Sequence, residues 1–377
     1  MSRAARAIVR LAAGLLPAEH HAWGRAMEAE IVAIEGAGPA FGFALGCLAA
    51  ALRTAAHVHI LRLSGGDKGE NEMAGDKGGL LRHPRRVAGL CALAATGLGL
   101  FYMAMAGAPA RYLAVNGTAL VLGFLAVAVL GRVGDVRRGI VDLMLAGALL
   151  LTALFGLSAG GVTRWLSVGG ILLQPGFFLL PILALRFAGS RDGLSAVAVS
   201  LAALALALQP DRALAGALAA GMAALAVAQP ERNVFIALAA AAAGLMATLL
   251  RGDPSDAVPY VDQVFASSFA VHPLAGLAVW AGAGLLLLPA LVGLARAGED
   301  RALHGVFGAL WFAVIVAAML GNYPAPLVGY GASAIFGYLF SLLGLPARGQ
   351  SEAVAPARDT DAAATEESPP ALLVRPA

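Results

Sequence analysis

Long apolar segments recur from about residue 87 to residue 345, and short polar or charged connections separate them. Most of these segments are long enough for a membrane-crossing helix, which needs about 20 apolar residues. Their apolar runs are continuous rather than alternating, which favours helices over the strands of a β-barrel. The pattern predicts an all-α polytopic membrane protein with about ten transmembrane helices, at residues 87–106, 112–131, 139–157, 170–187, 193–208, 213–229, 233–250, 273–295, 302–320 and 326–345.

The first 63 residues follow a different pattern. Within residues 3–15, apolar side chains recur at helical spacing opposite three arginines, and a second stripe of this kind follows within residues 18–38. A third apolar run, over residues 39–52, is short for a full span. Residues 1–63 are therefore predicted to form an N-terminal module of amphipathic helices that associates with the membrane.

Two polar segments border the apolar part of the chain. Residues 64–86 are rich in glycine and charge, which is typical of a flexible linker, and they end on a basic cluster. Residues 347–377 combine proline, alanine and acidic residues without periodicity, which predicts a disordered cytoplasmic tail. The transmembrane domain is thus expected over residues 87–346.

Composition narrows the class of protein further. Hydrophobic residues make up 59% of the chain and charged residues only 13%, whereas soluble globular proteins carry about 25% charged residues. A net charge of +3 without a long basic block argues against nucleic acid as a partner. The two cysteines and seven histidines lack companions at the spacing of a disulfide framework or a metal site.

The arginines of the connections indicate which side each one faces. Basic residues flank the first span at residues 82–86, which places that end in the cytoplasm. Counting spans from there puts Arg111, Arg164 and Arg212 on the outer side. Arginines on the outer side run against the positive-inside rule, so they are candidates for a function.

The longest polar break in the apolar pattern is the outer connection of residues 251–272. It carries three aspartates, Asp253, Asp256 and Asp262, in a chain that is poor in charge. Aspartates in such a connection often cap helices in a solvated loop. Carboxylates at a membrane surface are also candidates for acid–base chemistry, so this connection is the first place to expect a catalytic group.

Four stretches resemble motifs of the SEDS family (shape, elongation, division and sporulation; the FtsW/RodA type). GGVTRWLSVGGILLQPGFF at residues 160–178 resembles the family's "KRWI…QPSE", QPDRA at 209–213 resembles "QPDLGT", and YPAPLVGYGASA at 323–334 resembles "PLPFxSYGGSS". Asp262, followed by Phe265 and Ala266, matches the spacing around the family's essential aspartate. The resemblance covers about residues 87–345 and implies the SEDS fold.

The chain also departs from the family pattern. The acidic residue and the lysine that follow the family's first "QP" are replaced here at Gly176, Phe177 and Leu180. The two glutamates after the essential aspartate are missing, and Ala332 stands for the second glycine of "YGGS". The resemblance is therefore to a divergent member of the family.

The resemblance implies which residues form the site. Asp262 would be the catalytic residue. Arg164 and Arg212 lie at predicted outer ends of spans, where a guanidinium matches phosphate oxygens. The matched motif residues, expected to line a substrate groove, are Gln174, Pro175, Gln209, Pro210, Asp211, Pro324, Pro326, Tyr330, Gly331 and Ser333.

SEDS proteins polymerise lipid II at the outer face of the bacterial cytoplasmic membrane, often with a single-span penicillin-binding transpeptidase. The resemblance thus implies a peptidoglycan glycosyltransferase of cell-wall synthesis, division or shape control in that inner membrane. Asp262 would accept the proton of the attacking sugar hydroxyl, and Arg164 and Arg212 would bind the leaving pyrophosphate. A divalent metal held by Asp211 or Asp256 would serve the same purpose.

Two other functions stay open. A non-catalytic SEDS paralogue that acts as a scaffold or regulator is favoured by the lost acidic and lysine positions and by the added N-terminal module. A transporter of a lipid-linked precursor would need polar residues along a path through the spans. Asp142, inside the third predicted span, is one of the few such residues in this chain.

Overall fold

The computed structural model of the chain describes residues 3–16, 20–34, 83–132, 138–159, 162–251, 257–295 and 300–346, with shorter stretches between residues 36 and 51. The chain divides into two compact units, Met1–Leu80 and Leu81–Ala377. The predicted linker up to Arg82, the predicted tail from residue 347, and Asp253 and Asp256 lie outside the described residues.

In its described residues, the first unit contains two short helices and further helical residues between Gly38 and Ala51. The helices are α1 (Arg3–Leu15) and α2 (His21–Ala33). Val9 of α1 is buried in one apolar cluster with Met27 and Ile31 of α2, so the apolar stripes of both helices contribute to a shared core. The two helices lie where the periodicity predicts them, and the association of this unit with a membrane stays a prediction.

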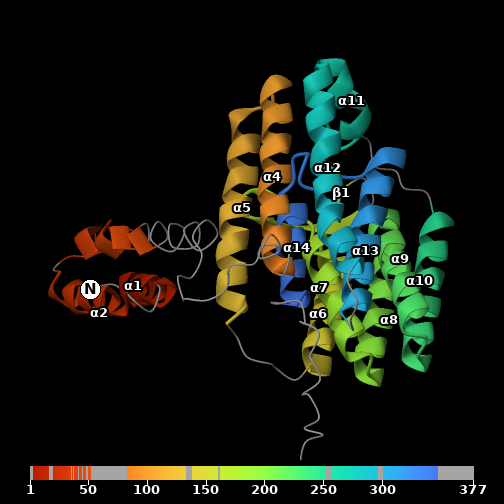
Figure 1. Cartoon of the computed structure of the whole chain (residues 1–377), viewed down its shortest axis with the longest axis horizontal. Coiled ribbons are helices and arrows are strands. Elements are labelled where there is room, and N and C mark those ends of the chain that lie inside the picture. The colour runs from red at the N-terminus through yellow and green to blue at the C-terminus, as the bar shows by residue number, and fades with distance from the viewer. Residues whose placement is uncertain are drawn as a thin grey trace, which may run out of the picture. The chain divides into compact units, whose positions relative to one another are not determined.

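The second unit is a bundle of apolar helices (Figure 1). They are α4 (Pro84–Met105), α5 (Ala110–Leu130), α6 (Arg138–Phe155), α7 (Gly176–Ser190), α8 (Gly193–Leu208), α9 (Arg212–Ala228), α10 (Arg232–Leu249), α12 (Pro273–Leu294), α13 (Arg301–Leu320) and α14 (Ala332–Ser341). Within the described ranges, α4, α5, α10, α12 and α13 are long and apolar enough to cross a membrane, and the apolar helical stretches of the others span 10–17 residues. The protein is a polytopic helical membrane protein.

A small three-stranded antiparallel sheet lies between α6 and α7, where the apolar pattern alone predicted a loop and an earlier start of the span. Its strands are β1 (Leu157–Ala159), β2 (Val162–Val168) and β3 (Ile171–Leu173). Gly169 and Gly170 both have positive φ, 59° and 80°, which suits a two-residue hairpin turn between β2 and β3. The prediction of a span from residue 170 is therefore wrong at its start, and α7 begins at Gly176.

The last predicted span, 326–345, also begins later than the apolar pattern suggested. Residues 321–331 form an irregular connection after α13, and α14 starts only at Ala332. Pro324 and Pro326 have no backbone N–H to give a helix, so this stretch cannot continue the helical hydrogen-bond pattern. A further short helix, α11 (Val264–Val271), precedes α12 and lies at the top of Figure 1.

Small residues let particular helices approach closely. A Cβ atom at Gly337 of α14 would collide with the backbone of Phe177 at the start of α7, so only glycine fits there. At Gly99 of α4 a Cβ atom would lie 2.7 Å from the backbone of Val328. These contacts hold the start of α7 and the 321–331 connection against α14 and α4.

The first and last helices of the bundle are joined by one side chain. Arg85, in the first turn of α4, donates from Nε to the carbonyl oxygen of Leu345 at 2.6 Å and from a terminal nitrogen to that of Leu343 at 3.1 Å. Both carbonyls follow the end of α14. A guanidinium thus satisfies carbonyl groups of the 3₁₀ turn Leu342–Gly344 and of the residue after it.

Candidate functional site

The loop that carries Asp262 is bound to the 321–331 connection by backbone hydrogen bonds. The N–H of Ala325 donates to the carbonyl of Val261 at 3.0 Å, and the N–H of Tyr330 donates to that of Tyr260 at 2.6 Å. Two stretches that were selected separately by their motif resemblance therefore lie side by side. This end of the bundle, where α10 and α13 end and α9 and α14 begin, is named the Asp262 end.

Asp262 closes a tight turn of its own loop. Its carboxylate Oδ2 accepts a hydrogen bond from the N–H of Val258 at 2.9 Å, and its own N–H donates to the carbonyl of Val258 at 3.0 Å. The residue is 8% exposed. The carboxylate is thus held in a defined position just before α11, with little of its surface open.

The backbone on both sides of Asp262 adopts an uncommon conformation. Tyr260 and Gln263 have φ of 65° and 55°, and Leu327 in the facing connection has φ of 60°. Left-handed backbone is rare for residues other than glycine and is strained. Such strain persists where the surrounding structure enforces it and is frequent at functional sites.

An aromatic side chain of α5, Tyr112, packs against both loops. Tyr112 stacks on Tyr330 with ring centroids 3.9 Å apart and meets Tyr260 edge-on at 6.0 Å. Burial raises the pKa of Tyr330 above its ordinary value. Arg111 lies over the ring of Tyr112, 5.2 Å from its centroid.

Asn116 of α5 clamps the connection on both sides of Tyr330. Its Nδ2 donates to the carbonyl of Gly329 at 2.8 Å, and its Oδ1 accepts from the N–H of Gly331 at 3.1 Å. Asn116 is fully buried. Sequence reasoning missed this residue, although an asparagine inside an apolar span is a visible signal of a buried polar contact.

The two glutamine–proline motifs meet at the same end of the bundle. Gln174, before α7, donates from Nε2 to Oδ2 of Asp211 at 2.6 Å, and its backbone N–H donates to the hydroxyl of Ser333 at 2.8 Å. Asp211 also caps α9 by accepting from the N–H of Leu214 at 3.1 Å. Gln174, Asp211 and Ser333 are all buried. Residues from three separate motifs thus form one polar cluster.

The two arginines predicted to bind pyrophosphate both donate to backbone carbonyls. Arg164 of β2 is buried and donates to the carbonyls of Gln209 and Pro210 at 3.3 and 3.2 Å. Arg212 donates from Nε to the carbonyl of Thr248 at 3.1 Å and from a terminal nitrogen to that of Arg251. These carbonyls belong to the carboxyl-terminal ends of α8 and α10, where the helix dipole favours cations.

The prolines of the matched motifs lie at helix ends. Pro175 precedes α7, Pro210 lies between α8 and α9, and Pro324 and Pro326 lie in the 321–331 connection. These prolines therefore shape the ends of helices, and their expected place in a substrate groove stays a prediction.

Asp211 is poorly suited to a divalent metal. One of its carboxylate oxygens accepts from the N–H of Leu214 and the other from Nε2 of Gln174, so a cation would compete with donors of the protein at both oxygens. Asp256, the alternative ligand, lies outside the described residues. Across the described ranges, no three histidine, cysteine, aspartate or glutamate side chains gather at metal-binding distance.

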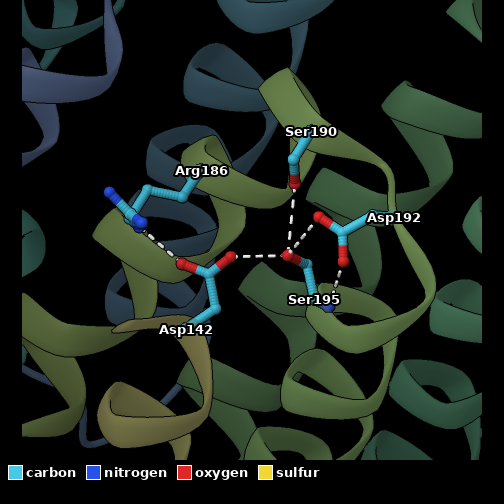
Figure 2. Close-up of polar contacts among 5 residues, drawn as sticks. All are labelled: Asp142, Arg186, Ser190, Asp192 and Ser195. Atoms are coloured by element: carbon cyan, nitrogen blue, oxygen red, sulfur yellow. Dashed lines mark hydrogen bonds and ion pairs between the residues drawn. The ribbon is translucent and has the colours of Figure 1, made fainter. Parts of the chain in front are cut away.

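A second polar cluster lies at the opposite end, named the Asp142 end (Figure 2). Asp142 of α6 is fully buried and accepts a hydrogen bond from Nε of Arg186 at 2.5 Å and from the Ser195 hydroxyl at 2.6 Å. Ser195 also contacts Asp192, whose pKa is lowered chiefly because its carboxylate accepts from the backbone N–H of Ser195. Asp142 thus pairs α6 with α7 and α8.

No protein-family model and no curated protein matches the chain. Among solved structures, the chain is similar to the rod shape determining protein RodA of Thermus thermophilus and to an aspartate-to-alanine mutant of it, each at 22% identity with a TM-score of 0.49. The first of these alignments covers 67% of this chain and 92% of that RodA chain. A structure from work on how a peptidoglycan synthase complex coordinates polymerization and crosslinking aligns at 20% identity and a TM-score of 0.47, over 67% of this chain and 94% of that one.

Proposed function

We propose that this protein is a SEDS-type peptidoglycan glycosyltransferase that polymerises lipid II at the outer face of the bacterial cytoplasmic membrane. The observation that carries the proposal is the pairing of the Asp262 loop with the Tyr330 connection. Both stretches resemble SEDS motifs, and backbone hydrogen bonds through Val261 and Tyr260 hold them together. A penicillin-binding transpeptidase with a single span is the proposed partner.

In the proposed reaction, a sugar hydroxyl of one lipid-linked unit attacks the anomeric carbon of another. The new carbon–oxygen bond forms as the bond from that carbon to the diphosphate oxygen breaks, and the electron pair leaves with the diphosphate. The proton of the hydroxyl passes to the carboxylate of Asp262, which acts as general base. Arg164 and Arg212 lie at the same end of the bundle and would offset the charge of the leaving diphosphate.

Three observations favour a second candidate, a non-catalytic scaffold or regulator of cell-wall synthesis. Asp262 is only 8% exposed and bonds within its own loop. Both arginines spend donors on backbone carbonyls. The positions where the family carries an acid and a lysine are filled here by core residues, since Phe177 and Leu180 are 2% and 0% exposed.

The two candidates differ in one measurement. The purified full-length protein is incubated with lipid II, and the glycan product is compared for wild type and Asp262→Asn. Asparagine keeps the shape of the side chain and an oxygen for the Val258 N–H, but it cannot act as the base, so we expect product formation to fall by about 10²–10⁴-fold. Asp192→Asn, at the opposite end, is the control and should polymerise like wild type. Equal product from wild type and Asp262→Asn, or none from wild type, would favour the scaffold.

A further inference from the structure

A polar pocket of about 300 Å³ lies at the Asp262 end, between the start of α9 and the end of α13. Arg212 and Ala213 form the wall from α9, and Asn322 and Tyr323 form the wall from the 321–331 connection. Ala317 and Leu320 of α13 complete it with apolar surface. The pocket thus combines a cation, an amide and a phenol with an apolar side.

Arg212 enters this pocket in a fixed position. Its contacts with the carbonyls of Thr248 and Arg251 anchor two nitrogens of the guanidinium. A guanidinium has five N–H donors, and those two bonds use two of them. An arginine that is anchored on one side and lines a pocket with its remaining donors is preorganised to bind phosphate oxygens.

The other polar wall is tied to the candidate catalytic loop. Gln263, the residue after Asp262, donates from Nε2 to Oδ1 of Asn322 at 2.9 Å. Three residues further along the chain, the N–H of Ala325 donates to the carbonyl of Val261. The Asn322 wall therefore keeps its position relative to the loop that holds Asp262.

The apolar side of the pocket indicates what kind of phosphate it suits. Leu320, on the pocket wall, is 84% exposed, and the neighbouring Met319 of α13 is 44% exposed. Exposed apolar side chains beside a cation fit an amphipathic ligand, whose chain lies on the helix surface while its head group meets the arginine.

We propose that this pocket binds the diphosphate head group of a polyprenyl lipid, with Arg212 and Asn322 as its phosphate-binding side chains and Gln263 as the residue that positions Asn322. The assignment rests on the proposed function for its place in the reaction, because the leaving group of glycosyl transfer from lipid II is such a diphosphate. Arg164, buried against the α8–α9 corner, does not line this pocket.

Binding of farnesyl diphosphate, farnesol and inorganic pyrophosphate to the purified full-length protein tests the site. We expect wild type to bind farnesyl diphosphate more tightly than pyrophosphate and farnesol. Asn322→Asp keeps an oxygen for Gln263 but adds a negative charge to the pocket. The affinity for farnesyl diphosphate should therefore fall about tenfold or more. Gln229→Glu, which adds the same charge at the other end of α9, is the control and should bind like wild type.

Equal affinity of wild type and Asn322→Asp, or no binding of farnesyl diphosphate to wild type, would overturn the site. Equal binding of pyrophosphate and farnesyl diphosphate would assign it to free diphosphate instead of a lipid. Arg212→Lys gives a second test, because lysine keeps the charge but not the planar fork, and weaker binding is expected again. Monodisperse elution of each variant shows that it is folded.

The binding site and the proposed function can be rejected independently of each other. A wild type that binds farnesyl diphosphate through Asn322 but makes no glycan would keep the site and reject glycosyl transfer. A wild type that makes glycan, with Asn322→Asp equal to it in both binding and product, would keep the function and reject the site.

Discussion

Gln174 donates a 2.6 Å hydrogen bond to Asp211, and so joins the residue that precedes α7 to the residue that caps α9. Both side chains are buried. Each comes from a glutamine–proline motif, and the contact makes the two motifs parts of one structure. A buried carboxylate needs such donors, because an unsatisfied charged group away from water is strongly unfavourable.

Replacing Gln174 with leucine should therefore destabilise the bundle. Asp211 would keep the Leu214 N–H but lose the donor of Gln174, which costs about 1–3 kcal/mol for a buried group. Thermal unfolding of the purified protein in detergent measures the change. Gln229→Leu, at the carboxyl-terminal end of α9, makes the same substitution at a half-buried position and should change stability by less than about 0.5 kcal/mol. Equal midpoints for the two variants would contradict the role of the bond.

Asp142 and Arg186 form an ion pair, so their contributions to the free energy of unfolding should be coupled. Asp142→Asn removes the carboxylate that Arg186 contacts, and Arg186→Gln removes the guanidinium beside the buried Asp142, so each change should destabilise the protein by up to about 3 kcal/mol. The double variant should lose less than the sum, because it no longer holds an unpaired charge. A double-mutant cycle of unfolding free energies measures this, and strict additivity would argue against the pair.

Asp192 should make the stability of the folded protein depend on pH in the acid range. Its folded pKa is lowered by the N–H of Ser195, so its contribution to stability is present above the unfolded value of about 3.9 and is lost as pH falls through the lower folded value. The free energy of unfolding of wild type should exceed that of Asp192→Asn by a constant amount near pH 6. This difference in unfolding free energy should shrink below about pH 4. A difference that grows on acidification would contradict the sign.

Asn116 should control the opening of the Tyr330 connection. Asn116→Leu removes both hydrogen bonds to Gly329 and Gly331 and leaves a buried carbonyl and a partly buried N–H without these partners, at about 1–3 kcal/mol. Hydrogen exchange at the amide of Tyr330, which donates to Tyr260, should become faster. The amide of His304, at the Asp142 end, serves as the internal control. Unchanged exchange at Tyr330 would show that the clamp is dispensable.

The helices were predictable because each depends on a long local apolar run. The predicted span 193–208 coincides with α8, and 273–295 differs from α12 by one residue. The β2–β3 hairpin was not predicted, although two glycines follow Val162–Val168 and mark a turn. Its strands lie beside a long apolar run, so the turn signal of the two glycines was hidden by the stronger signal of a span.

The site was predictable only in part. Motif resemblance selected residues from segments that do lie together, as Gln174 and Ser333 show. The partners of the arginines were not predictable, because they are backbone carbonyls whose position depends on how helices pack. Tyr112 and Asn116 of α5 were missed for the same reason, since only tertiary contact relates them to Tyr330.

The bond from Arg85 to the carbonyl of Leu345 has a topological consequence. Because one side chain bridges the beginning and the end of the helical domain, the two ends of this domain lie close together. A short peptide joining residue 346 to residue 83 would close the domain into a ring, and new termini could be opened elsewhere without separating neighbouring helices. Circular permutation is thus a natural way to relocate the ends of this domain.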